Sequence, residues 1–336
     1  MRRPLTATDR PRAAAGDPGR PDLDDDAVMA AARDVESTGL DPADILVRDQ
    51  VAVVTGGGGG IGQGIALGLA RFGADVAVLD IVADRQVATV QAIERLGRRA
   101  HGVTCDVMDP VQLRAGIAEA CESLGGLDIL VNNAGGVRAT PFLRQSERSI
   151  RRHVDVNLTS MLIATHEAAQ TMVRSGRGTA IVNVSSVEAT RGAPMYAVYA
   201  ACKAAMVNFT KTMALELSGY GIRVNCIAPD HTITPGVRGN REGPVDPATW
   251  DDTSAGWAGL IPLGREGLVE ECAAAVIWLC SDMARYVTGI TVNVDGGTSA
   301  SSGWLRQPDG AWTLDPALRH SWSGHVPPPD EPPPSR

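Results

Sequence analysis

The feature that most constrains the fold is a run of glycines that directly follows a short apolar segment. Residues 50–55 read QVAVVT, and Gly56–Gly60 follow without a break before helical spacing begins at Ile61. A continuous apolar run of this length suits a strand that is buried on both faces of a parallel sheet. Glycines between such a strand and a helix let a pyrophosphate approach the backbone, and the helix N-terminus offers N–H donors. The sequence therefore predicts a phosphate-binding loop, although a glycine-rich turn without a ligand would look similar.

Strand and helix patterns alternate from this point along most of the chain. Apolar runs predict strands at 50–55, 75–80, 100–105, 127–132, 179–185, 222–228 and 290–294. Helical spacing predicts helices at 61–72, 83–96, from 110 onward, and at 146–174, 199–217 and 269–281. Strands that alternate with helices pair in parallel through right-handed crossovers. We therefore expect an α/β fold with a single Rossmann-like, doubly wound parallel sheet of about seven strands and helices on both faces.

The two ends of the chain differ in composition from the part between them. Residues 1–48 are rich in Arg, Asp, Pro and Ala, which predicts a mostly disordered N-terminal extension. Residues 49–302 form the expected domain. Residues 303–336 form a C-terminal extension that is Pro-rich at its end.

Charge and composition argue against several classes of function. The formal net charge of −8 disfavours binding to nucleic acid or to an anionic membrane. No apolar stretch approaches the roughly 18 residues of a membrane span, and no secretory signal is apparent, so we expect a cytoplasmic protein. The six cysteines form no C-x-x-C pair and the six histidines show no ligand spacing. We therefore expect free thiols and no metal site.

Two further patterns point to a dinucleotide and to proton transfer. Asp80 ends the second strand, where a carboxylate would accept hydrogen bonds from an adenosine ribose and repel the 2′-phosphate of NADP. An ordinary strand-end aspartate is the alternative. Ser186 ends the fifth strand, and Tyr199 and Lys203 follow it at the i, i+4 spacing of one helix face. A nearby ammonium stabilises tyrosinate, so a phenol can exchange a proton near neutral pH. The chain holds only two lysines and four tyrosines, so few such pairs would arise by chance.

Together these motifs resemble the short-chain dehydrogenase/reductase family over about residues 49–300. The matching motifs, in chain order, are T-G-x-x-x-G-I-G at 55–62, Asp106–Val107, N-N-A-G at 132–135, Asn157 in VDVN, Ser186, Y-x-x-x-K at 199–203, the segment 229–234, and V-D-G-G at 294–297. Their number and their order make the resemblance specific.

The resemblance implies a role for each matched position. Tyr199 would donate or accept the proton, and Lys203 would lower the pKa of Tyr199 and hold the nicotinamide ribose. Ser186 would hydrogen-bond the reacting oxygen, and Asn157 would order a water linked to Lys203. The residues implied in cofactor binding are Gly56, Gly60, Ile61, Gly62, Asp80, Asp106, Val107, Asn133, Ala134, Gly135, Tyr199, Lys203, Thr232 and Thr234.

Two positions depart from the pattern of the family. Asp230 stands where a glycine usually follows Pro229, and Thr232 stands where Ile or Val is common. Both positions lie in the loop that is expected to meet the nicotinamide carboxamide. A carboxylate of Asp230 that faces the nicotinamide would favour the positively charged oxidised ring. A harmless loop variation is the alternative.

The resemblance implies an NAD-dependent oxidoreductase that interconverts a secondary alcohol and a ketone, with Tyr199 as general acid/base and NAD as cofactor. Two alternatives remain: reduction of a 3-oxoacyl thioester, and a catalytically idle NAD-binding sensor or scaffold. The partner is a small-molecule alcohol or ketone of unspecified identity. The segment from about 235 to 263 is expected to cover the substrate. It contains Trp250, Trp257, Arg238 and Arg241, which would suit a ring with an acidic group or would simply pack.

The resemblance also implies self-association, because relatives commonly form tetramers. We expect a homo-oligomer, a tetramer or a dimer. Trp304 and Trp312 lie beyond the expected domain, and large apolar side chains on a free tail would be costly. We therefore expect residues 303–315 to pack on the domain or on a neighbouring subunit, the alternative being a free tail.

Overall fold

The structure is a computed structural model that describes residues 39–234, 259–306 and 312–314. Three sequence predictions lie outside these ranges: the extension before residue 39, most of the expected substrate cover with its Trp and Arg residues, and the Pro-rich end.

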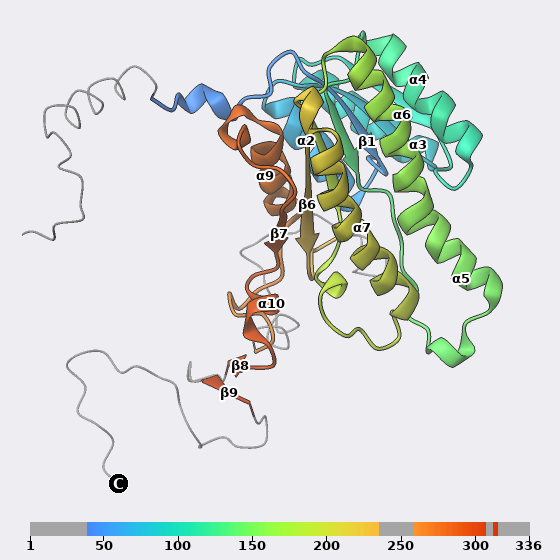
Figure 1. The fold of residues 1–336 in the computed structure, drawn as a ribbon, viewed down its shortest axis with the longest axis vertical. Coiled ribbons are helices and arrows are strands. Elements are labelled where there is room, and N and C mark those ends of the chain that lie inside the picture. The colour runs from blue at the N-terminus through green and yellow to red at the C-terminus, as the bar shows by residue number, and fades with distance from the viewer. Residues whose placement is uncertain (1–38, 235–258, 307–311, 315–336) are drawn as a thin grey trace, which may run out of the picture. The chain divides into compact units, whose positions relative to one another are not determined.

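A parallel sheet of seven strands forms the centre of the domain (Figure 1). The strands are β1 (Val51–Thr55), β2 (Asp75–Asp80), β3 (Ala100–Thr104), β4 (Ile129–Asn132), β5 (Ala180–Val184), β6 (Arg223–Pro229) and β7 (Thr291–Val294). They lie in the order β3-β2-β1-β4-β5-β6-β7, and every pairing is parallel. The predicted fold class is confirmed, because each apolar run forms a strand within two residues of its expected bounds.

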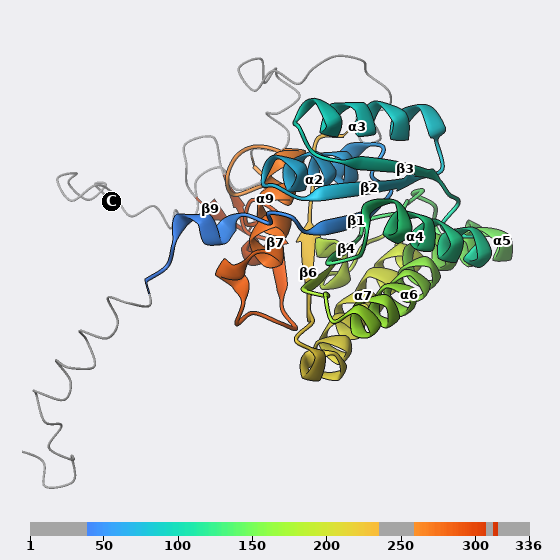
Figure 2. The same ribbon diagram turned by 90° about the horizontal axis from the view of Figure 1, so that it is seen from above.

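Helices cover both faces of the sheet, because successive strand residues point to opposite sides. The main helices are α2 (Gly60–Arg71), α3 (Ala83–Arg95), α4 (Pro110–Leu124), α6 (Ser160–Ser175), α7 (Ala197–Glu216) and α9 (Val269–Cys280). α2, α3 and α9 pack on the face that includes Val54 and Val131. α4, α6 and α7 pack on the opposite face, which includes Val53 and Leu130 (Figure 2).

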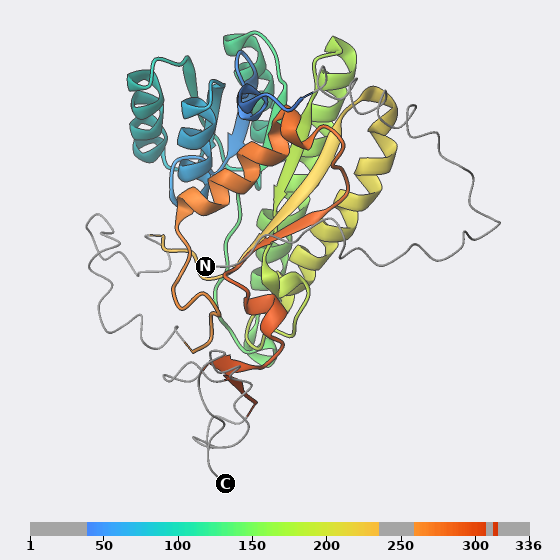
Figure 3. The ribbon, with the colours of Figure 1, turned by 90° about the vertical axis from the view of Figure 1, so that its left-hand side faces the viewer.

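The helices α2 and α9 lie side by side on one face of the sheet (Figure 3). Their approach depends on glycines in α2. A Cβ at Gly64 would lie 2.8 Å from Cβ of Val269, and a Cβ at Gly68 would lie 3.1 Å from Cβ of Ala273. This contact fixes α2 against α9, and it thereby also holds the loop that precedes α2.

The strand order places a crevice between β1 and β4. The chain runs outward from β1 to β2 and β3, then returns to β4 and continues outward on the other side. In open α/β sheets the ligand binds outside the carboxyl ends of the strands at such a switch point. The loops that follow β1, β4, β5 and β6 therefore define where a functional site should lie.

The helix predicted at 146–174 is interrupted, which corrects the sequence prediction. It consists of α5 (Glu147–Val154), a π-helical turn (Asp155–Thr159) and α6. Ser146 is the N-cap of α5, with its hydroxyl accepting the N–H of Ser149 at 3.2 Å. Apolar spacing does not distinguish a single π-turn from continuous α-helix, and such turns are frequent at functional sites. Asn157 lies in this turn and is fully buried.

Short segments at both ends of the expected domain also have defined structure. Val47 is fully buried, and its N–H donates to the carbonyl of Phe72 at 2.9 Å. After the short helix α10 (Thr298–Ser301), β8 (Leu305–Arg306) pairs with β9 (Trp312–Thr313) in antiparallel orientation. Packing of residues 303–315 on a surface and the homo-oligomer stay predictions. Within the described ranges, no helix is both long enough and apolar enough to cross a membrane.

Candidate active site

The loop between β1 and α2 turns so tightly that it requires glycine. Gly56 and Gly60 have φ values of 64° and 55°, a region that disfavours other residues. A Cβ at Gly62 would lie 2.2 Å from the carbonyl oxygen of Gly56 and 2.3 Å from Nδ2 of Asn133. No side chain fits there without movement of the backbone. The loop therefore presents the N-terminus of α2 to the crevice, the arrangement that favours a bound phosphate.

Thr55 and Asn133 join this glycine loop to the end of β4. Oγ1 of Thr55 accepts the N–H groups of Asn133 and Ala134, both at 3.1 Å. Nδ2 of Asn133 donates to the carbonyls of Thr55 at 3.0 Å and Gly56 at 3.1 Å. The amide of Asn133, predicted to line the cofactor, thus holds the loop in shape. Thr55 is part of the motif, but the sequence prediction did not include it among the site residues.

Asp80 lies against the glycine loop, as its place at the end of β2 predicts. One carboxylate oxygen accepts the N–H of Gly58 and the other accepts the N–H of Val82, both at 2.9 Å. Arg85 in the first turn of α3 lies at the same place, since a Cβ at Gly58 would be 3.1 Å from Cβ of Arg85. The glycine run 56–60 itself contains no basic residue. Arg85 comes from a neighbouring helix, so the sequence of the loop does not indicate it.

The residues after β3 lie at the same edge of the sheet. Oδ1 of Asp106 accepts the N–H of Met108 at 2.9 Å, and Val107 packs against the apolar cluster under α4. Asp109 caps α4 by accepting the N–H of Val111 at 2.9 Å. The adenine contacts expected of Asp106 and Val107 stay predictions.

Ser186 and Tyr199 come together across the loop between β5 and α7. They lie close enough for Ser186 to act on the phenol by hydrogen bonding, and Oγ of Ser186 accepts the N–H of Glu188 at 3.2 Å. Burial raises the pKa of Tyr199, the hydrogen bond with Ser186 lowers it, and the charge of Glu188 raises it further. The net direction is upward.

Lys203 lies one helical turn beyond Tyr199 and is buried, with 3% of its surface exposed. Its ammonium is 5.6 Å from the centroid of the Tyr199 ring and donates to the carbonyl of Val184 at 2.7 Å. Burial lowers the pKa of Lys203 to about 8. The resemblance implied that Lys203 gives Tyr199 a lowered pKa. That contribution of Lys203 stays a prediction, and the net shift of the Tyr199 pKa is upward because burial of the phenol has the largest effect.

Asn157 and Lys203 converge on the backbone that follows β4. A Cβ at Gly135 would lie 2.9 Å from Oδ1 of Asn157 and 3.6 Å from Nζ of Lys203. Asn157 also donates to the carbonyls of Gly136 at 2.8 Å and His153 at 2.9 Å. The π-turn thus brings a buried amide beside the ammonium. The water that would link Asn157 and Lys203 stays a prediction.

The loop after β6 reaches back over the glycine loop. A Cβ at Gly60 would lie 3.4 Å from Cγ2 of Thr234. Thr232 is buried, and its hydroxyl donates to the carbonyl of Asp230 at 3.1 Å and contacts Sγ of Cys272 at 3.8 Å. The side chain of Thr232 therefore faces into the domain, so a cofactor contact from this residue would have to come from its backbone.

Asp230 is paired with an arginine, and the effect of its charge on a nicotinamide stays a prediction. Its Oδ1 accepts a hydrogen bond from Nη2 of Arg191 at 3.2 Å, and only 8% of its side chain is exposed. Arg191 comes from the segment after Ser186, and the sequence analysis did not select it.

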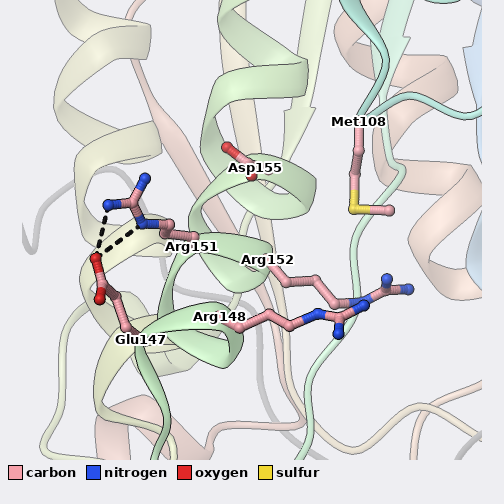
Figure 4. A pocket seen from close by; sticks show the side chains of 6 residues that line it. All are labelled: Met108, Glu147, Arg148, Arg151, Arg152 and Asp155. Atoms are coloured by element: carbon pink, nitrogen blue, oxygen red, sulfur yellow. Dashed lines mark hydrogen bonds and ion pairs between the residues drawn. The ribbon is translucent and has the colours of Figure 1, made fainter.

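A surface pocket of about 560 Å³ lies along α5. Met108, Glu147, Arg148, Arg151, Arg152 and Asp155 line it (Figure 4). Arg148 and Arg152 extend toward Met108, whereas Arg151 turns to Glu147 at 2.6 Å. The pocket includes none of the predicted site residues, and it offers no neutral proton-transfer group. We therefore place the functional site at the carboxyl edge of the sheet.

The fold and this site define an oxidoreductase with a Rossmann-like architecture, in which a glycine loop and a Ser–Tyr–Lys group share one edge of the sheet. A family profile described as enoyl-(acyl carrier protein) reductase matches residues 56–299. The chain belongs to the short-chain dehydrogenase/reductase family.

Several known proteins are similar to most of this chain. The 3beta-hydroxysteroid dehydrogenase 1 of Eggerthella lenta is 40% identical over 262 residues, which are 77% of this chain and 97% of that protein. L-rhamnose 1-dehydrogenase (NAD(P)(+)) of a Sphingomonas species is 36% identical over 253 residues, 75% of this chain and 97% of that protein. The structure of 7 alpha-hydroxysteroid dehydrogenase complexed with NADH and 7-oxo glycochenodeoxycholic acid has a TM-score of 0.70 at 32% identity and covers 77% of this chain and 98% of its own.

Proposed function

We propose that this protein interconverts a secondary alcohol and a ketone with NAD as cofactor, and that Tyr199 transfers the proton. The observation that carries the proposal is the convergence of Ser186, Tyr199 and Lys203 beside the glycine loop. Two similar proteins are named hydroxysteroid dehydrogenases, which supports an alcohol–ketone pair as the substrate class. A sensor or scaffold would have no use for a buried ammonium next to a phenol, since burying a charge is costly.

The glycine loop fits a dinucleotide. Gly56, Gly60 and Gly62 leave the backbone open to a pyrophosphate at the N-terminus of α2, and Asp80 lies where an adenosine ribose would follow. Lys203 and Asn157 would hold the nicotinamide ribose side, and Thr234 would close over the loop. When bound, the nicotinamide supplies or accepts the hydride.

The side chains of the site perform the proton transfer. In alcohol oxidation, Ser186 holds the substrate hydroxyl by a hydrogen bond, and Oη of Tyr199 accepts its proton. In ketone reduction, Oη of Tyr199 returns a proton to the carbonyl oxygen while Ser186 stabilises the charge that develops there. The ammonium of Lys203 favours tyrosinate electrostatically, against the cost of burial. Asn157 would connect Lys203 to solvent through a water.

A screen of substrates tests this proposal directly. Hydroxysteroids, sugars, simple secondary alcohols and a 3-oxoacyl thioester would be offered with NAD or NADH, and the absorbance of the reduced nicotinamide would be followed. Turnover of an alcohol that Tyr199→Phe abolishes would support the proposal. Turnover of the thioester alone would favour the second enzyme class. Tight NAD binding without turnover of any compound would favour the sensor.

The proposed proton transfer predicts opposite pH dependences for alcohol oxidation and ketone reduction. Tyr199 must be deprotonated to accept a proton and protonated to donate one. Because the pKa of Tyr199 is raised, chiefly by burial, alcohol oxidation should keep rising into the alkaline range while ketone reduction falls. Loss of the Lys203 proton near pH 8 raises the pKa of Tyr199 further, because it removes the charge that favours tyrosinate, and so moves both trends to higher pH. Initial kcat/KM values in both directions would check this, and parallel pH trends would exclude Tyr199 as the proton-transfer group.

The position of Asp80 predicts a preference for NAD over NADP. Its carboxylate would repel a 2′-phosphate, so Asp80→Ser should narrow the ratio of kcat/KM for NAD to that for NADP by about tenfold or more. Arg85 supplies the positive charge that becomes available to the phosphate once Asp80 is replaced. Adding Arg85→Ala to Asp80→Ser should therefore reduce the gain with NADP. A wild-type preference for NADP, or an unchanged ratio in Asp80→Ser, would contradict the proposal.

A further inference from the structure

Arg191 joins two acidic side chains from different parts of the chain. Its Nη2 donates to Oε1 of Glu188 at 2.9 Å and its Nε donates to Oε2 of Glu188 at 3.2 Å, a two-pronged pair. The same Nη2 donates to Oδ1 of Asp230 at 3.2 Å. Charge-assisted pairs of this geometry are stronger and more directional than single contacts. The three side chains therefore behave as one unit.

This unit connects two sides of the site. Glu188 belongs to the 3-10 turn Val187–Ala189, and its N–H donates to Oγ of Ser186 at 3.2 Å. Asp230 begins the loop after β6, the loop that carries Thr234 over the glycines. Arg191 thus ties the turn that orients Ser186 to the loop on the cofactor side. Water screens these ion pairs only weakly, because 8% of the Asp230 side chain and 21% of the Glu188 side chain are exposed.

The unit also sets the charge beside Tyr199. Negative charge on Glu188 disfavours tyrosinate, and Arg191 offsets that charge. Arg191 acts on Asp295, after β7, as well. Burial opposes the shift, but hydrogen bonds from Ser299 and Gly297 and the charge of Arg191 hold the pKa of Asp295 below its usual value. The charged groups at Tyr199 are Lys203, with its ammonium 5.6 Å from the ring centroid, and Glu188, whose charge acts on the phenol and which pairs with Arg191.

We propose that Arg191 is a positioning residue for the reaction: it holds Glu188 and Asp230 together, fixes the turn that orients Ser186, and neutralises the carboxylate charge next to Tyr199. The proposal rests on the proposed role of Tyr199 in turnover. Its charge component, however, concerns the ionisation of Tyr199 and is measurable without a substrate.

The test is a titration of Tyr199 by NMR in the full-length protein. Tyrosine carrying ¹³C at Cζ reports ionisation, and the Tyr199 signal is the one that Tyr199→Phe removes. Arg191→Gln removes a positive charge and should raise the midpoint of Tyr199 by about half a pH unit or more. Glu188→Gln removes a negative charge and should lower the midpoint by a similar amount. Arg191→Lys keeps the positive charge but cannot form the two-pronged pair, so it should move the midpoint less than Arg191→Gln does.

A matched control lies at the opposite edge of the sheet. Arg177 holds Asp128 through two hydrogen bonds, at 3.2 Å and 2.8 Å, where β4 and β5 begin. Arg177→Gln should lower the melting temperature without moving the Tyr199 midpoint. Shifts of Arg191→Gln and Glu188→Gln in the same direction would indicate a general disturbance and would overturn the proposal. So would an unchanged midpoint in Arg191→Gln.

Kinetics separate this proposal from the proposed function. In the assay with a substrate identified by the screen, Arg191→Gln should shift the alkaline rise of alcohol oxidation to higher pH and lower kcat more than it raises KM. If Tyr199→Phe keeps its turnover, the proposed function fails, while opposite midpoint shifts still support the charge role of Arg191. If Tyr199→Phe is inactive but Arg191→Gln has the wild-type midpoint and pH profile, the role of Arg191 alone fails.

Discussion

Tyr199→Phe should lower turnover by about two orders of magnitude or more, the scale of general acid–base catalysis by a positioned side chain. The substitution keeps the ring that packs between Ser186 and Lys203 and removes only the hydroxyl. Binding of NAD should therefore change little, because the glycine loop and Asp80 lie on other elements. The loss should appear in kcat, measured in both reaction directions at matched pH.

Tyr196 and Tyr220 offer controls for this substitution. Tyr196 is the N-cap residue of α7 and lies three residues from Tyr199, but no lysine follows it at the same spacing. Tyr220 is exposed at 62% of its surface and follows α7. Tyr220→Phe should leave turnover within a factor of about two, as expected for a surface change. Near-normal turnover in Tyr199→Phe would contradict the assignment of the proton to this residue.

Gly62→Ala should disrupt both the fold around the glycine loop and the binding of NAD. The new Cβ would be placed 2.2 Å from the carbonyl oxygen of Gly56 and 2.3 Å from Nδ2 of Asn133, so the backbone has to move. Forced overpacking of this kind costs about 3 kcal/mol of unfolding free energy, at the upper end of the usual range. Movement of the loop should also raise the dissociation constant of NAD by at least about tenfold, which corresponds to about 1.4 kcal/mol of binding free energy.

Gly59→Ala is the matched control within the same glycine run. Gly59 has an extended φ of −162°, and its Cβ would have no neighbour closer than 3.9 Å, at Cδ of Arg85. The remaining cost is the change of N-cap residue, about 1 kcal/mol or less. Denaturant unfolding and calorimetric titration with NAD would compare the two variants. Equal stability and equal affinity in Gly62→Ala and Gly59→Ala would show that the close contact at Gly62 does not constrain the loop.

The proposed role of Arg191 changes how Asp230 is interpreted. A glycine is usual at this position in the family that the chain resembles, and an unpaired carboxylate there would act on the nicotinamide. Arg191 instead ties Asp230 to Glu188. Along the chain, Asp230 is 39 residues from Arg191, and Glu188 is three residues from it. Asp230→Gly should therefore both remove a negative charge and release Arg191 from its contact. Measuring the dissociation constants of NAD and NADH for Asp230→Gly and for Arg191→Gln separates these two effects.

The sequence by itself determined the sheet, most helices and the core of the site. Apolar runs and helical spacing are properties of neighbouring residues, so they predict elements such as β2 and α3 within a residue or two. The glycine loop, Ser186 at a strand end, and Tyr199 and Lys203 on one helix face are likewise local patterns. Parallel pairing then brings the carboxyl ends of the strands to one edge, which places these patterns together.

Only the tertiary structure decided which residues from separate elements meet, and how strongly each is buried. Arg85 lies on the glycine loop because α3 packs there. Arg191 meets Asp230 because β5 and β6 pair in parallel, so that the loops that follow them begin side by side. The upward shift in the pKa of Tyr199 depends on burial, which no spacing in the sequence reveals. Helical and strand periodicity can be read from residues that are close in the sequence. Desolvation and ion pairing depend on the distances between atoms that only folding brings together.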